Sequence, residues 1–140
     1  MKSIHEVLRD SAGEPAGGSG MAAGPALNLT AALDRVGGDE ELLRELAGLF
    51  IDDYPRQLQQ IEEAIGKQDW KTAEREAHSL KGAVANFGAS DASEAARAVE
   101  FAAREGRYSE LSALLEGTRA EMVRVRAELD RLSPGGFTSP

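Results

Sequence analysis

The chain has 140 residues, of which 41% are hydrophobic and 29% charged, and its formal net charge is −8. This acidic balance argues against binding to nucleic acid or an anionic membrane through bulk charge, because phosphate groups require a positive surface. The absence of cysteine excludes disulfides and thiolate chemistry. No apolar run approaches the ~18 residues that span a bilayer, and the N-terminus lacks the apolar core of a signal peptide. We therefore expect a cytoplasmic protein.

Composition divides the chain into three parts. Residues 11–26, SAGEPAGGSGMAAGPA, are rich in glycine, alanine, serine and proline, which is typical of a linker with too little apolar content to fold. We therefore predict a flexible N-terminal segment at 1–27, a folded domain at 28–132 and a disordered tail at 133–140.

The first two predicted helices lie at the start of the domain. A short helix begins near Asn28 or Thr30, both good caps, and stops at the two glycines at 37–38. The second begins after Asp39 and continues to Gly66, with Pro55 expected to kink it and not to end it, since the apolar period persists beyond the proline. The apolar residues with this period are Leu42, Leu43, Leu46, Leu49, Phe50, Leu58, Ile61 and Ile65.

Three further helices complete the domain. Asp69 is expected to cap a third helix that runs to about Phe87. Asp91 and Glu94 have the spacing of a capping box for a fourth helix ending near Gly106. A fifth helix is predicted at 109–132. Short loops between long amphipathic helices indicate an all-α fold, an antiparallel four-helix bundle with a short additional N-terminal helix.

The third predicted helix has one apolar stripe. At about 100° per residue, His78 lies roughly 140° from the centre of this stripe and is expected to face solvent. The stripe consists of Trp70, Ala73, Ala77, Leu80, Val84 and Phe87, with Ala83 at its margin. We expect the stripe to be buried in the bundle core.

Small residues follow His78 on the exposed side of this helix. Gly82 lies one turn after His78, although a glycine inside a helix costs roughly 1 kcal/mol relative to alanine. Its missing side chain leaves room beside the imidazole, and Ala85 places only a small side chain on the next turn. We therefore predict that another molecule approaches His78 here.

Positive side chains share the same side of the helix. Lys81 can bring its ammonium group near the ring, and Arg75 and Lys71 add positive charge from the preceding turns. This patch is predicted to hold an anion on or near His78. No metal cluster or carboxylate pair adjoins His78 in the sequence, so the histidine is interpreted as a carrier and not as a complete active site.

These residues closely resemble the histidine-containing phosphotransfer (Hpt) domain of two-component phosphorelays. The family pattern is roughly A-H-x-L-K-G-x-x-x-x-x-G-A, and residues 77–89 read AHSLKGAVANFGA. The segment LDRVGGDEELLRELAGLFIDDYPRQLQQIEEAIGKQDW is similar to the first two helices of the family, and AVEFAAREGR to the end of its fourth. The resemblance covers about residues 28–132.

The resemblance implies a four-helix bundle that exchanges phosphoryl groups. His78 matches the phospho-acceptor, which takes the group from a receiver-domain aspartate and passes it to a second receiver. Lys81 matches the residue that holds the phosphoryl group, and Gly82 the glycine that clears access. No cofactor of its own is implied, and a divalent metal ion belongs to the partner receiver. The chain is then either the C-terminal module of a hybrid sensor histidine kinase or a free-standing Hpt protein.

Four other interpretations fit parts of the sequence. A helical interaction module without phosphotransfer shares the fold, and the phospho-accepting domain of chemotaxis kinases shares a similar motif. A sensor-kinase fragment is disfavoured, because HEVLR at His5 lacks the expected proline and no glycine-rich ATP-binding region is present. A metal-binding bundle requires inward Glu-x-x-His motifs, whereas His78 is predicted to point outward.

Overall fold

Side-chain caps start three helices where the sequence predicts them. The computed structural model describes residues 25–132. In each case a carboxylate or amide oxygen accepts a hydrogen bond from the backbone N–H three residues later, 3.0–3.2 Å away. The caps are Asn28 for α2 (Leu29–Arg35), Asp39 for α3 (Glu40–Gly66) and Asp69 for α4 (Trp70–Ala85). Helix α4 ends two residues before the predicted end at Phe87.

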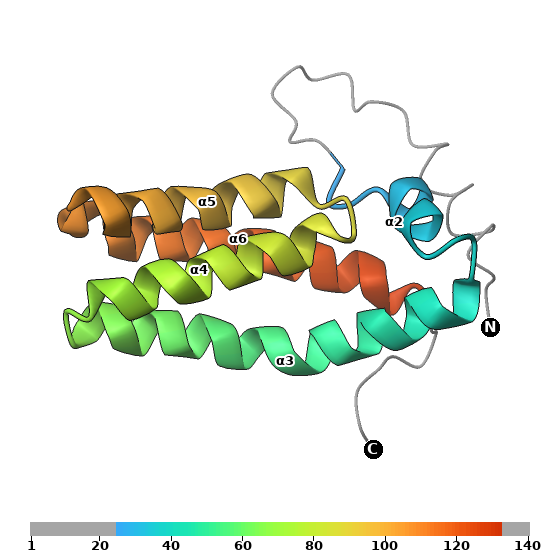
Figure 1. Cartoon of the computed structure of the whole chain (residues 1–140), viewed down its shortest axis with the longest axis horizontal. Coiled ribbons are helices and arrows are strands. Elements are labelled where there is room, and N and C mark those ends of the chain that lie inside the picture. Colours follow the sequence, from blue (N-terminus) through green and yellow to red (C-terminus); the bar gives the residue numbers. More distant parts are fainter. Residues whose placement is uncertain (1–24, 133–140) are drawn as a thin grey trace.

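Helix α3 runs through Pro55 as one element of 27 residues. The predicted continuation of this helix past the proline is therefore confirmed (Figure 1). Proline lacks the N–H that would complete one helical hydrogen bond, but burial of the apolar residues on both sides keeps the two halves on the core. These flanking residues are Ile51, Tyr54, Leu58 and Ile61.

The predicted capping box at Asp91 and Glu94 is wrong. Helix α5 (Ser90–Glu105) is preceded by Ala89, and no side chain caps its N-terminus. The chain turns sharply at Gly88, where φ is +67°, and buries Ala89 in the core, so the helix begins before Asp91 is reached. Asp91 instead lies in the first turn, 3.3 Å from the guanidinium of Arg124.

The last part of the chain forms a short 3-10 turn and a long helix. The turn η1 covers Tyr108–Glu110, and α6 covers Leu111–Asp130, two residues inside each predicted end. Gly106 ends α5 in the left-handed conformation, with φ of +81°, as expected for a glycine just after a helix.

Figure 1 shows the four long helices running side by side, with α2 across one end, beside the loop that joins α4 to α5. Helix α4 packs on α3 and α5, and α6 closes the bundle against α5 and α3. The fold is all-α, as predicted. Both α4 and α5 bury alanines, whose small side chains let helices approach closely. They include Ala73 and Ala77 of α4 and Ala92 and Ala96 of α5, all at most 1% exposed.

The apolar stripe of α4 is buried except at its first residue. Trp70 is only partly buried, because it stands at the end of the bundle, where its ring stacks on Tyr108 with centroids 3.9 Å apart. The rest of the stripe belongs to the core. Within residues 25–132, no helix is long and apolar enough to cross a membrane. The predicted linker up to residue 24, His5 and the predicted tail at 133–140 lie outside the described residues.

Candidate functional site

His78 lies in the middle of α4, on the face opposite its buried stripe. Its side chain is 66% exposed, whereas Ala77 and Leu80 beside it are fully buried. The helical period thus places the imidazole on the outer surface of the bundle while α4 stays anchored in the core. The ring is open to approach from solvent.

A carboxylate from the neighbouring helix holds the ring. Glu100 of α5 is 2% exposed, and its Oε2 lies 2.9 Å from Nδ1 of His78. Its Oε1 accepts a hydrogen bond of 2.8 Å from Nζ of Lys81. Because an ionised carboxylate only accepts, Nδ1 carries the proton and donates it, which leaves the lone pair on Nε2. Glu100 therefore positions both the histidine and the lysine.

The charge of Glu100 is stabilised by its donors. Burial by itself raises the pKa of this carboxyl group, but the hydrogen bonds and positive charge of Lys81 and the contact with His78 outweigh burial and hold the pKa below its usual value. Arg104 also donates from Nη2 to Oε2 of Glu100 at 2.9 Å, and from Nε to Glu74 at 2.7 Å. The cluster thus joins α4 and α5 through paired charges.

The predicted cations occupy different positions around the ring. Lys81 lies in the cluster, 25% exposed. Arg75 is exposed on the turn before His78, and its Nε lies 3.6 Å from Glu76. Lys71 is exposed two turns before His78. The structure brings His78 and Lys81 together through Glu100, whereas Arg75 pairs with a neighbour on its own helix.

Gly82 borders open space. A Cβ atom built on it meets no atom within 4 Å, so packing inside the protein does not require glycine here. Ala85, which is half-buried, lies one turn further, and its carbonyl accepts a 2.7 Å hydrogen bond from Arg35 of α2. The surface of α4 one turn after His78 therefore carries no side chain at Gly82.

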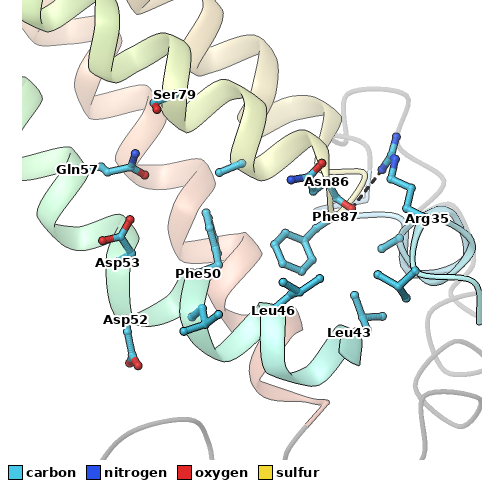
Figure 2. Close-up of a pocket in the computed structure, with 14 residues that line it drawn as sticks. Arg35, Leu43, Leu46, Phe50, Asp52, Asp53, Gln57, Ser79, Asn86 and Phe87 are labelled. Carbon is cyan, nitrogen blue, oxygen red and sulfur yellow. Dashed lines mark hydrogen bonds between the residues drawn. The ribbon is translucent and has the colours of Figure 1, made fainter. Parts of the chain in front are cut away.

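A groove of about 740 Å³ lies between α2, α3 and α4 and reaches Ser79, the residue after His78. Figure 2 shows Phe50, Leu46 and Leu43 along one wall, Phe87 and Asn86 opposite, and Asp53 and Gln57 toward Ser79. The apolar residues of α3 are not all core residues: Leu42 and Leu46 are 39% and 40% exposed, and Leu49 is 67% exposed. A contiguous exposed apolar surface is typical of an interaction site on a soluble protein.

Helix α2 closes one end of this groove. Arg35 donates to the carbonyls of Ala85 and Asn86, and the N–H of Asn28 donates to the carbonyl of Phe87 at 3.0 Å. A Cβ atom on Gly88 would lie 2.6 Å from the Cβ of Asn28, so glycine is needed for this close approach. The end of the groove is therefore fixed to the end of α4.

Sequence reasoning missed Glu100. The sequence did contain an indication of its burial. Glu100 lies on the same face of α5 as the buried residues Ala96, Val99 and Ala103. A charged residue on a buried face indicates a partner, but the helical pattern does not show which one. Within the described residues, no group of three or more histidine, aspartate or glutamate side chains is arranged to hold a metal ion.

Comparisons with known proteins agree with this geometry. The sequence profile of the Hpt domain family matches residues 45–134. The crystal structure of histidine-containing phosphotransfer protein B (HptB) from Pseudomonas aeruginosa PAO1 is similar, with a TM-score of 0.72 and 25% sequence identity. The match covers 78% of this chain and 95% of that one. Curated protein sequences give no match.

Proposed function

The chain belongs to the Hpt domain family, whose members carry phosphoryl groups in phosphorelays, and on this premise we propose that His78 is the phospho-acceptor. It takes the group from the aspartate of one receiver domain and passes it to the aspartate of another. The observation that carries the proposal is the exposed imidazole whose Nδ1 is held by Glu100, because this arrangement presents the Nε2 lone pair outward.

The cluster around His78 supplies what phosphoryl transfer requires of this partner. Transfer depends on in-line positioning and on neutralising the charge of the phosphoryl oxygens. Lys81 uses one of its three N–H donors on Glu100, and the other two are available to a phosphoryl group on Nε2. The divalent metal ion belongs to the receiver, which carries the aspartate.

The groove beside His78 provides a docking surface for the receiver. Its apolar wall is on α3, and Gly82 borders open space on the exposed face of α4 beside it. An apolar element of the receiver packing against Leu46 and Leu49 would bring its phosphoaspartate to the level of Ser79 and His78. The same contacts serve donor and recipient receivers, because each meets the same histidine in turn.

The experiment is incubation with a phosphorylated receiver domain and Mg²⁺. We expect acid-labile phosphate on His78, as for a phosphorus–nitrogen bond, and none on the His78→Gln protein. His78→Gln should keep its helical circular dichroism, because the side chain lies on the surface. His5→Gln is the matched control and should accept phosphate like the wild type. Undiminished phosphate on His78→Gln, or acid-stable label on Ser79, would show that the acceptor is elsewhere.

The same variant separates this proposal from the alternative of an interaction module without phosphotransfer. A pure interaction module would bind the receiver equally well with or without the His78→Gln substitution, and it would never become labelled. The proposed transfer is the same for a module tethered to a hybrid sensor kinase and for a free-standing protein. In both contexts the partners are receiver domains and the expected location is the cytoplasm.

A further inference from the structure

Glu100 is a charged side chain in a place where a neutral one could also accept the hydrogen bond from the ring. Its side chain is 2% exposed, at a packed boundary between two helices. A buried charge is costly unless its partners compensate it. A glutamine has the same reach and could also accept a hydrogen bond from Nδ1. The negative charge therefore calls for a role beyond orienting the imidazole.

The charge of the ring changes during transfer. The Nε2 lone pair attacks the phosphorus of the receiver's acyl phosphate, the N–P bond forms, and the P–O bond to the aspartate breaks as the aspartate leaves as a carboxylate. No proton moves in this step. The imidazole, neutral with its proton on Nδ1, thus becomes an imidazolium that bears the phosphoryl group. The new positive charge appears on the ring whose Nδ1 is 2.9 Å from Oε2 of Glu100.

We propose that the negative charge of Glu100 keeps the proton on Nδ1 while Nε2 carries the phosphoryl group, so that the loaded histidine remains an imidazolium. From this form the phosphoryl group departs from a neutral imidazole, which is a good leaving group. If the ring lost its proton, the leaving group would be an imidazolate anion, and transfer to the next receiver would slow. This inference rests on the proposed function and concerns how the loaded state is held.

Other charged groups modulate this effect without touching the ring. Lys81 donates a hydrogen bond to Oε1 of Glu100, and Arg104 donates one to Oε2, which also contacts His78. The positive charges of Lys81 and Arg104 therefore partly neutralise the carboxylate. Glu74 of α4 binds Arg104 in turn. On the α3 side, Asp53 lines the groove together with Ser79. Glu100 is the carboxylate that contacts the ring itself. Glu94, on the same helix, is a matched carboxylate outside the cluster, since it is 73% exposed and pairs with Arg97.

The test compares wild type, Glu100→Gln and Glu94→Gln after loading with phosphoramidate, a small donor that needs no receiver. Nitrogen-15 NMR of the loaded histidine reports whether Nδ1 is protonated as the pH rises. We expect the midpoint in Glu100→Gln to fall by about one pH unit, since an opposite charge at this distance favours the charged form. At higher pH its transfer to a receiver should be about tenfold slower. Glu94→Gln should resemble the wild type.

Equal midpoints in wild type and Glu100→Gln would overturn the inference. If Glu100→Gln does not fold, the test uses the phosphorylated wild type alone. A phosphorylated ring that keeps its Nδ1 proton at about pH 7 supports the inference. A phosphorylated ring that has lost this proton contradicts the inference. Failure of the proposed function has a different signature. The wild type would then load from phosphoramidate but exchange nothing with a phosphorylated receiver.

Discussion

The two sides of α4 meet their neighbouring helices in opposite ways. Toward α5, small alanines bring the backbones together around a buried carboxylate that holds His78, Lys81 and Arg104. Toward α3, the surfaces part and leave a groove whose leucines remain exposed. The α5 side holds the side chains around His78 in fixed positions, and the α3 side leaves an exposed apolar surface that a partner can cover. We infer that chemistry belongs to the α5 side and partner binding to the α3 side.

The largest effect is expected on the α5 side. Lys81→Ala removes the ammonium that Glu100 holds beside the ring, and loss of one such group costs about a hundredfold in kcat where charge develops. The KM for the receiver should change little, because Lys81 is only 25% exposed and offers little contact area. Single-turnover kinetics with a phosphorylated receiver measure both constants.

Lys67→Ala is the control for this variant. Lys67 is exposed at the C-cap of α3, outside the cluster around His78. Its removal changes the net charge of the protein by the same amount. A loss of rate equal to that of Lys81→Ala would mean that overall charge, and not the position of the ammonium, supports transfer.

On the α3 side we expect a smaller effect of the opposite kind. Leu46→Asp places a charge on the apolar wall of the groove and should raise the KM for the receiver about tenfold, as for loss of one well-packed contact. Loading from phosphoramidate should be unchanged. Val123→Asp on α6 is the matched control, since Val123 is also exposed, at 68%, and lies outside the groove. If both variants raise KM equally, the groove is not the docking surface.

The smallest effect concerns Gly82, which lies between the two sides. Gly82→Ala should raise the free energy of unfolding by roughly 0.5–1 kcal/mol, because alanine is the better helix former and its Cβ meets open space. Urea denaturation measures this difference. Gly82→Gln should also fold but transfer more slowly, since its side chain occupies the approach to His78. Unchanged transfer by Gly82→Gln would show that clearance here does not matter.

Helical periodicity in the sequence predicted most of the fold. It placed the long helices to within about two residues and identified the buried stripe of α4, because burial of one face repeats along the chain. It failed where a loop or an end decides the outcome. Ala89 enters the core and starts α5 before the predicted capping box, and Trp70 stacks on Tyr108 at the end of the bundle.

The candidate site could also be predicted only in part from the sequence. Exposure of His78 and the open space at Gly82 follow from position on one helix, so the sequence suffices. Glu100 is 22 residues from His78, and its contact depends on how α5 is rotated against α4. The groove depends on the separation of α3 from α4, which leaves Leu46 and Leu49 outside the core. Contacts between helices of this kind are not encoded in any single helical pattern.

The hold of Arg35 on the last carbonyls of α4 has a kinetic consequence. Because α2 is tied to α4 by this guanidinium and by Asn28, the end of the groove is preformed and needs no ordering when a partner arrives. A rigid surface lowers the entropic cost of each encounter, so moderate affinity can coexist with rapid arrival and departure. Brief, frequent visits would suit the proposed transfer between two receivers in turn.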